Sequence, residues 1–294
     1  MVPITVNTGL VPLMGKPLSF SFAPRMQNTT YKALGLDLVY FPLEVENDHL
    51  EKMVQAFRYM NSPGFAVTKP NKIKVIEYLD GLDELAEKMG AVNTVVKRDG
   101  KLIGYNTDGE GFIHSMKENT GIDFKENAFF CFGAGGAGRA ACSCLAFYGA
   151  KKIVITDAVD EAAKSLAEDI NKIFAPVASW IPFEEKVKHE EEIRTANVVM
   201  NCTGLGMFPD INETPIDISL MNKDQIAFDA TYNPTKTLFL KEAELIGCKI
   251  LNGEGMSYCQ GAIQINLWTG KPAPFEQMKA ENDKIVAEMQ AAQK

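Results

Sequence analysis

Apolar and polar positions alternate along the first third of the chain in a pattern that predicts short strands and amphipathic helices. An apolar stretch at 37–45 predicts a strand, and the spacing of apolar side chains across 48–60 predicts a helix. Residues 93–108 predict a hairpin that turns at Asp99-Gly100, because this dipeptide favours a tight turn. The other elements expected here are a strand at 64–68 and helices at 71–79 and 82–90.

From about residue 127 the pattern changes to long apolar strands separated by helices. Residues 127–157 predict a strand, a glycine turn, a helix and a second strand. Such strands are typical of a parallel sheet that is covered by helices on both faces. Further strands are expected at 177–181, 197–203, 226–231 and 248–252, and helices at 256–270 and 274–293.

These elements predict an α/β protein with two domains. The first spans 1–110, and the second, a doubly wound parallel sheet of the Rossmann type, spans 111–252. The C-terminal helices within 253–294 are expected to return to the first domain. A chain of 294 residues is long enough for two such cores.

Composition and charge narrow the range of partners. The formal net charge is −8, which argues against a nucleic-acid partner because phosphates require a basic face. The chain has neither an apolar run of the roughly 18 residues that span a bilayer nor a recognisable signal peptide. Six cysteines without a C-x-x-C pair indicate buried thiols in a reducing cytoplasm, and three scattered histidines argue against a zinc site. We therefore expect a cytoplasmic protein without a metal, a membrane partner or a nucleic-acid partner, and a homodimer stays open.

A glycine-rich turn follows the first strand of the second domain. Its glycines have the spacing G-x-G-x-x-G, and the motif sits where a strand ends and a helix begins. The first glycine permits the tight turn, the second lets a pyrophosphate approach the backbone, and the third lets the helix pack closely on the strand. The sequence therefore predicts a dinucleotide site at Gly133, Ala134, Gly135, Gly136, Ala137 and Gly138.

The next strand ends at Asp157, about twenty residues beyond the glycine turn. A carboxylate there accepts hydrogen bonds from the hydroxyl groups of the adenosine ribose and repels a 2′-phosphate. Asp160 and Glu161 add negative charge, and no arginine follows to compensate. We therefore expect NAD to be preferred over NADP. The alternative is that Asp157 only caps the following helix.

Seven short motifs, in order, resemble those of the shikimate dehydrogenase family, and the resemblance covers nearly the whole chain. The segment "AVTKPNK" resembles the family motif N-V-T-x-P-x-K. The other six are "GAVNT", "GYNTDGEGF", "FGAGGAGRA", "NCTGLGM", "FDATYNPTKT" and "GMSYCQGA".

The resemblance implies a fold, an activity and a set of site residues. The fold is a substrate domain and a nucleotide domain with a cleft between them, and the activity is the NAD(P)-dependent interconversion of shikimate and 3-dehydroshikimate, or of quinate and 3-dehydroquinate. Lys72 matches the catalytic lysine and Asp108 its carboxylate partner. The implied substrate contacts are Ser21, Thr68, Asn93, Tyr232 and Gln260. The implied cofactor contacts are the turn at 133–137, Thr203, Ala230 and Gly253.

The residue types at the two expected catalytic positions suit this chemistry. Hydride transfer between an alcohol and a nicotinamide also requires a proton to move, and a lysine ammonium can supply it and stabilise charge on the oxygen. A carboxylate nearby is expected, because an unpaired charge in a cleft is unfavourable. We therefore assign Lys72 as acid and base and Asp108, expected in a domain-joining turn, as its orienting partner. Lys69, at the variable position of the motif, is expected to be solvated.

The chain departs from the family in the segment that anchors the substrate carboxylate. The family pattern is S-x-S-P-x-M-H-N, whereas this chain has "SFSFAPRMQN", with Ala23 at the second serine position and Gln27 at the histidine position. Ala66 replaces the asparagine of N-V-T. Ser19 offers a substitute hydroxyl on the same face as Ser21 if the segment is extended. Phe20 and Phe22 of this segment are bulkier and less polar than expected for a substrate anchor, and the alternative is that both are core residues.

Two alternatives therefore stay open. The same fold and chemistry could act on a different cyclic hydroxy acid or polyol, as Ala23 and Ala66 suggest. A non-catalytic NAD-binding sensor is the other alternative, against which the joint presence of Lys72, Asp108 and Asn93 argues, since a sensor has no use for proton transfer.

Overall fold

The computed structural model describes residues 4–19 and 21–292 of the chain. The chain divides into two compact units, which are Met1–Gly111 with Ser257–Lys294, and Phe112–Met256. Two helices, α4 (Thr107–Thr120) and α9 (Glu254–Thr269), contain the points at which the chain passes from one unit to the other. The first unit is thus assembled from both ends of the chain.

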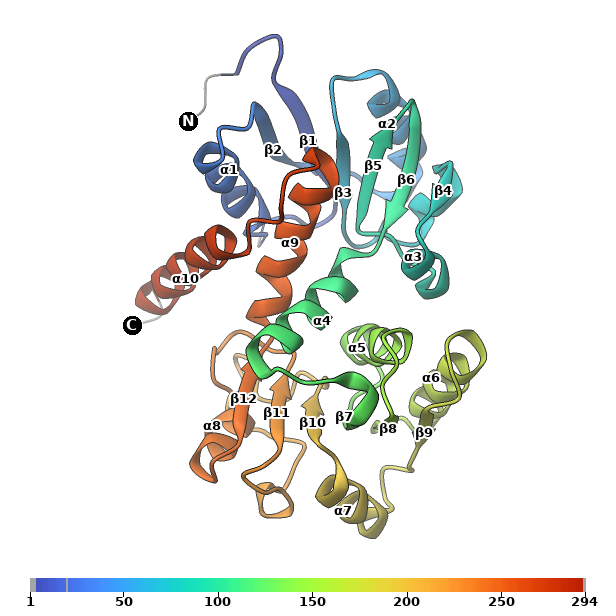
Figure 1. Cartoon of the computed structure of the whole chain (residues 1–294), viewed down its shortest axis with the longest axis vertical. Coiled ribbons are helices and arrows are strands. Elements are labelled where there is room, and N and C mark those ends of the chain that lie inside the picture. The colour runs from blue at the N-terminus through green and yellow to red at the C-terminus, as the bar shows by residue number, and fades with distance from the viewer. Residues whose placement is uncertain (1–3, 20, 293–294) are drawn as a thin grey trace. The chain divides into compact units, whose positions relative to one another are not determined.

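The first unit is built on a mixed six-stranded sheet of order β2-β1-β3-β5-β6-β4 (Figure 1). β1, β2 and β3 are parallel, and β5 is antiparallel to both β3 and β6. Its elements besides α4 and α9 are β1 (Gly9–Gly15), α1 (Ala23–Ala33), β2 (Leu38–Glu44), α2 (Asn47–Tyr59), β3 (Gly64–Val67), the 3₁₀ turn η1 (Lys74–Tyr78), β4 (Gly81–Leu82), α3 (Glu84–Met89), β5 (Thr94–Arg98), β6 (Lys101–Tyr105) and α10 (Phe275–Ala292).

Helices cover both faces of this sheet with separate apolar clusters. One cluster joins the sheet to α1, α9 and α10 through side chains such as Met26, Ile265 and Met278. The other joins it to α2, η1 and α3 through side chains such as Val54 and Val75. The central strands β1 and β3 are therefore buried on both sides, which explains their apolar character.

Two expectations for this unit need correction, and the condition attached to Ser19 is not met. The helix expected at 71–79 is a short 3₁₀ turn at Lys74–Tyr78 that follows an irregular turn. Asp108 is expected in a domain-joining turn, but it lies in the first turn of α4. The segment before α1 is not extended, because the Ser21 N–H donates to the Leu18 carbonyl across a tight turn.

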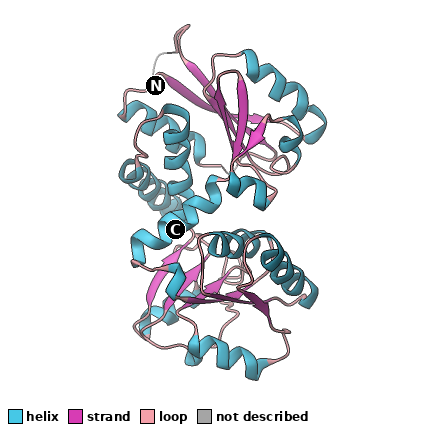
Figure 2. Ribbon diagram, turned by 45° about the vertical axis from the view of Figure 1, so that its right-hand side comes forward, coloured by secondary structure: helices cyan, strands magenta, loops and turns pink. Residues whose placement is uncertain are grey.

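The second unit is an all-parallel six-stranded sheet of order β12-β11-β10-β7-β8-β9 (Figure 2). The first strand of this unit, β7, lies in the middle of the sheet. The next two strands extend the sheet on one side of β7, and the last three extend it on the other side, which is the arrangement of a doubly wound fold. Its elements are η2 (Phe124–Glu126), β7 (Ala128–Phe132), α5 (Gly136–Phe147), β8 (Lys152–Thr156), α6 (Asp160–Ile173), β9 (Ala178–Trp180), α7 (Lys186–Thr195), β10 (Val198–Asn201), η3 (Ile218–Leu220), β11 (Ile226–Asp229), α8 (Leu238–Leu245) and β12 (Lys249–Asn252).

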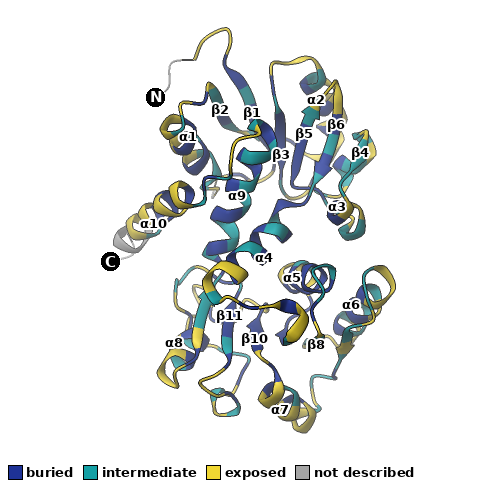
Figure 3. Ribbon diagram, in the orientation of Figure 1, coloured by how far each residue is buried: buried dark blue, intermediate teal, exposed yellow. Residues whose placement is uncertain are grey.

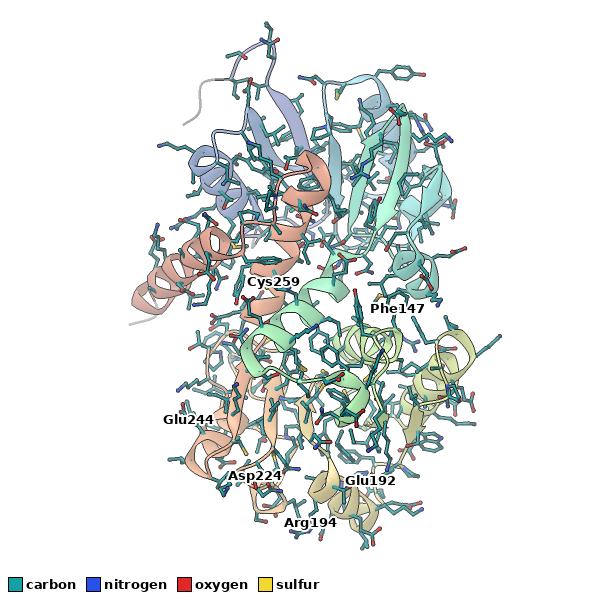
Figure 4. The ribbon with its side chains drawn as sticks, viewed as in Figure 1. Phe147, Glu192, Arg194, Asp224, Glu244 and Cys259 are labelled. Atoms are coloured by element: carbon teal, nitrogen blue, oxygen red, sulfur yellow. The ribbon has the colours of Figure 1, made fainter. Side chains whose placement is uncertain are left out.

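The central strands of the second unit are buried, while its helices expose their outer faces (Figure 3). Phe130 on β7, Val199 on β10 and Phe239 on α8 belong to one apolar cluster of this unit. At the surface, Lys152 on β8 forms an ion pair of 2.6 Å with Glu192 on α7, which Figure 4 labels. All six cysteines are free and buried, as expected. Within the described part of the chain, no helix is long and apolar enough to cross a membrane.

Candidate active site

The first unit contains a close lysine–carboxylate pair. The Nζ of Lys72 lies 2.7 Å from Oδ2 of Asp108, which makes both a hydrogen bond and an ion pair. The two side chains are 32% and 22% exposed, so the pair is partly shielded and still open to a small molecule. The neighbouring Lys69 is exposed, which confirms the expectation that it is solvated.

Local structure holds both members of the pair in place. Lys72 follows Asn71, a fully buried residue whose Nδ2 donates to the Val45 carbonyl over 2.7 Å. The Lys72 carbonyl accepts the N–H of Val92 over 2.9 Å, so the backbone is anchored on both sides of the lysine. Asp108 lies in the first turn of α4, where an acidic side chain is favoured by the helix dipole.

A cluster of amides and hydroxyls lies in the same unit. Asn93 is 3% exposed, and its Nδ2 lies 3.0 Å from the Thr107 hydroxyl and 3.5 Å from Oε1 of Gln260. The Thr107 N–H donates to Oδ1 of Asn93 over 2.8 Å. Because Thr107 immediately precedes Asp108, this bond ties the amide of Asn93 to the start of α4. Gln260 lies on α9 next to Cys259, which Figure 4 labels.

Two titratable groups close to this site were not anticipated from the sequence. Burial, and to a smaller extent the negative charge of Asp108, raises the pKa of the Tyr40 phenol. Burial, and then the charge of Asp83, raises the pKa of Glu110 from 4.5 to about 7. Tyr40 lies within an apolar strand and Glu110 within a helix, and neither position carries a sequence signal that distinguishes it from ordinary structure.

The other expected substrate contacts are distributed differently. Ser19 and Ser21 are both exposed, and they lie on the turn that precedes α1. Thr68 directly follows β3 and is half-buried. Tyr232 belongs to the second unit and is 48% exposed. Phe20, which also drew attention in the sequence, lies outside the described residues.

The positions at which the chain departs from the family motifs are packed rather than open. Ala66 is 1% exposed and lies on β3 opposite Leu13 and Thr94 of the neighbouring strands. Gln27 is also 1% exposed and donates to the Gly261 carbonyl of α9. Ala23, the first residue of α1, is half-buried. Phe22 precedes Ala23 and packs against the apolar core, which was one of the two interpretations of this side chain.

The second unit has the geometry of a dinucleotide turn between β7 and α5. Gly133 has φ +101°, which favours glycine, and a Cβ there would lie 2.7 Å from the Cys202 carbonyl group. A Cβ on Gly138 would lie 1.8 Å from the Gly133 carbonyl oxygen, so α5 can approach the strand only with glycine here. A Cβ on Gly135 or Gly136 would meet nothing within 4 Å. The turn is thus tight on its inner side and open on its outer side, as a bound pyrophosphate requires.

Asp157 follows β8 and contacts this turn directly. Its Oδ2 accepts the N–H of Ala134 over 2.7 Å, and its Oδ1 accepts the N–H of Val159 over 2.8 Å. The second bond forms a small turn before α6, but the N-cap of that helix is Val159, so Asp157 does not cap it. The carboxylate therefore lies beside the glycine turn, where the ribose of a dinucleotide binds in this fold.

The remaining expected cofactor positions follow the ends of other parallel strands. Thr203 comes after β10, and its hydroxyl donates to Oδ1 of Asn201 over 2.7 Å. The N–H of Ala230, after β11, donates to the Asn201 carbonyl over 2.9 Å. A Cβ on Gly253, after β12, would lie 2.1 Å from the Ala230 carbonyl oxygen, so this glycine permits close packing of neighbouring loops. Ligands of doubly wound sheets bind at this edge.

Comparison with known proteins gives consistent matches over nearly the whole chain. Residues 13–95 match the shikimate dehydrogenase substrate binding domain, and residues 253–281 match the shikimate 5′-dehydrogenase C-terminal domain. A relative from Alkaliphilus oremlandii, shikimate dehydrogenase (NADP(+)), is 39% identical over 94% of this chain and 96% of its own.

Two solved structures show the same fold. Shikimate 5-dehydrogenase from Listeria monocytogenes, in complex with shikimate and NAD, superposes with a TM-score of 0.90 at 38% identity, covering 95% of this chain and 98% of the other. Quinate dehydrogenase from Corynebacterium glutamicum, in complex with NAD, superposes with a TM-score of 0.84 at 31% identity, covering 93% and 98%.

Proposed function

Because the chain belongs to the shikimate dehydrogenase family of NAD(P)-dependent oxidoreductases, we propose that it interconverts shikimate and 3-dehydroshikimate with NAD as the preferred cofactor. The observation that carries the proposal is the 2.7 Å contact between Lys72 and Asp108. This contact supports the proposal because Lys72 can donate or accept a proton and is partly exposed. The amides of Asn93 and Gln260, which lie 3.5 Å apart, belong to the same unit.

In this proposal, the nicotinamide takes up or supplies the hydride, and the chain handles the proton. Lys72 donates a proton to the ketone oxygen during reduction and removes it from the alcohol during oxidation. Its positive charge also stabilises negative charge that grows on that oxygen. Asp108 orients the ammonium and compensates its charge when the site closes around a substrate.

Substrate binding is assigned to the polar side chains that match substrate positions of the family motifs. Asn93, Gln260 and Thr68 are proposed to bind the ring hydroxyls. Ser19 and Ser21 are proposed to bind the carboxylate, since both are exposed on the turn before α1. Tyr232, a residue of the second unit, also matches a substrate position of the family and stays a prediction.

The cofactor is proposed to bind along the glycine turn and the strand ends of the second unit. The N–H groups at the start of α5 bind the pyrophosphate, and Thr203, Ala230 and Gly253 border the nicotinamide end. The preference for NAD rests on Asp157, whose carboxylate contacts the turn at Ala134. A 2′-phosphate at this position would meet a negative charge, whereas ribose hydroxyls would find an acceptor.

Quinate is the second candidate substrate. The quinate dehydrogenase from Corynebacterium glutamicum shares the fold over nearly the whole chain. In this chain, Ala66 and Gln27 are packed into the interior instead of lining an open surface. The proposed chemistry of Lys72 and Asp108 is the same for either substrate.

The proposal is tested by initial rates of NAD and NADP, each with shikimate and with quinate, followed by the absorbance of the reduced cofactor. We expect turnover with NAD and at least one of the two acids. Lys72→Ala should lower kcat by at least tenfold and leave the Kd of NAD unchanged. The matched control Lys69→Ala changes an exposed lysine three residues away and should keep normal rates. A smaller loss in Lys72→Ala would exclude this lysine as the proton donor.

A further inference from the structure

A buried glutamine of α1 is hydrogen-bonded to a glutamine of α9. Nε2 of Gln27 donates to Oε1 of Gln264 over 3.0 Å and to the Gly261 carbonyl over 3.2 Å. The two glutamines are 1% and 2% exposed. Among the described residues, Oε1 of Gln27 has no hydrogen-bond partner although it is buried. A buried acceptor without a partner is unfavourable for folding, so its presence calls for a functional explanation.

The hydrogen bonds continue from Gln264 towards the active site. Nε2 of Gln264 donates to the Thr94 hydroxyl over 2.9 Å. The Thr94 hydroxyl donates to Oδ1 of Asn93 over 3.0 Å. Nδ2 of Asn93 then lies 3.5 Å from Oε1 of Gln260. The series is a relay of side chains that begins at Gln27 and ends at the two amides proposed to bind substrate, and all of its members are buried except Gln260, which is partly exposed.

All members of the relay donate in the same direction, and this determines which amide atoms are available. Oδ1 of Asn93 accepts from the Thr94 hydroxyl and the Thr107 N–H, so Nδ2 must point to the other side. Oε1 of Gln260 is turned towards Asn93. Gln260 is therefore left to present its Nε2 donor. Turning either amide around would place two donors or two acceptors against each other.

We propose that Gln27 and Gln264 are positioning residues that hold Asn93 and Gln260 in place so that Nε2 of Gln260 is available for an acceptor oxygen of the substrate ring. Nδ2 of Asn93 lies within hydrogen-bond distance of both the Thr107 hydroxyl and Oε1 of Gln260, so it orients Gln260. This inference rests on the proposed function, which places those two amides on the substrate. Gln27 itself acts only through Gln264 and Thr94. A purely structural role for Gln27 is the competing explanation, and it makes a different prediction.

The variant Gln27→Met distinguishes the positioning role of Gln27 from a purely structural role. Methionine has a similar volume and removes both the donor and the unpartnered acceptor. If Gln27 has only a structural role, this substitution should have little effect on the KM for shikimate. A positioning glutamine would raise the KM for shikimate about 5- to 20-fold, with kcat changed less than threefold, because a misplaced hydrogen bond weakens recognition. The Kd of NAD should stay unchanged, and the thermal midpoint should fall, because the buried Oε1 of Gln264 loses its donor.

The complete experiment uses the full chain with Gln27→Met, Gln264→Met and the double variant. Because both act through one relay, the double variant should have the KM of the worse single variant. The matched control is Gln225→Met, which alters another buried glutamine, bonded to the Ile193 and Ala196 carbonyls of the second unit. It should lower the thermal midpoint and leave KM unchanged. The proposal would be overturned if the KM of the double variant rose by the product of the two single effects. It would also be overturned if the KM of either single variant stayed within twofold of the parent value.

A measurement without substrate separates this inference from the proposed function. The side-chain amide resonances of Asn93 and Gln260 are assigned in ¹⁵N-labelled protein through their loss in Asn93→Ala and Gln260→Ala. Gln27→Met should shift both resonances, and Gln225→Met should shift neither. Shifted resonances without turnover of shikimate or quinate would overturn the proposed function and keep the relay. Unshifted resonances would overturn the relay whatever the enzyme turns over.

Discussion

Replacing Glu110 with glutamine tests whether a partly buried carboxylate makes the first unit less stable at high pH. Burial and the charge of Asp83 raise the pKa of Glu110 from 4.5 to about 7. Among the described residues, no ion pair is present at its carboxylate to offset this. The folded protein therefore holds the proton more tightly than the unfolded chain between these two pH values. Raising the pH across this window should lower the free energy of unfolding.

The magnitude follows from the size of the shift. Moving a pKa from 4.5 to about 7 corresponds to an upper bound of about 3 kcal/mol, since one pKa unit is about 1.4 kcal/mol. Glu110 keeps some exposure to solvent, so we expect about 1 to 2 kcal/mol. Glu110→Gln, which is neutral at every pH, should match the parent protein near pH 4.5 and exceed its stability by that amount at pH 8.

The assay is urea unfolding followed by the fluorescence of Trp268, which is buried in the first unit. Because the chain has two tryptophans, a Trp180→Phe background removes the signal of the second unit. Glu51→Gln, which changes an exposed glutamate of α2, is the control and should not alter the pH dependence. If Glu110→Gln changes stability by the same amount at pH 5 and pH 8, within about 0.5 kcal/mol, the reasoning is refuted.

The cofactor site gives two further predictions. Gly138→Ala should lower the thermal midpoint by several degrees, because its Cβ would lie 1.8 Å from the Gly133 carbonyl oxygen. Gly135→Ala has open space around its Cβ, so calorimetry should show weaker NAD binding with an unchanged midpoint. Equal midpoints in the two variants would contradict this. Asp157→Ala should narrow the difference between the Kd values of NAD and NADP, and a parent protein that binds NADP at least as tightly would contradict the assignment.

Local features of the sequence predicted most of the fold. The hairpin turn is confirmed by Asp99 and Gly100, which have φ 51° and 77° between β5 and β6. The strand–turn–helix around Gly133 is confirmed as β7 and α5. The parallel sheet was predictable because its strands are apolar throughout and alternate with helices.

Where the fold was missed, tertiary contacts outweighed the local pattern. β1 has Pro12 at its centre, which argues against a strand, yet it pairs with β2 on one side and β3 on the other. The segment at 71–79 has a helical pattern, but the buried side chain of Asn71 ties its start to the Val45 carbonyl. Both effects depend on contacts with residues far away in the sequence. Local periodicity carries no information about such contacts.

The sequence by itself determined which chemical groups the protein has and the order in which they occur. The tertiary structure alone decided which of these groups meet. Lys72 and Asp108 are 36 positions apart and lie at 2.7 Å, and Gln27 and Gln264 are 237 positions apart and lie at 3.0 Å. Hydrogen bonds and charges act over a few ångströms, so they depend on how helices and strands pack. That packing arises from apolar side chains throughout the chain, and no single motif encodes it.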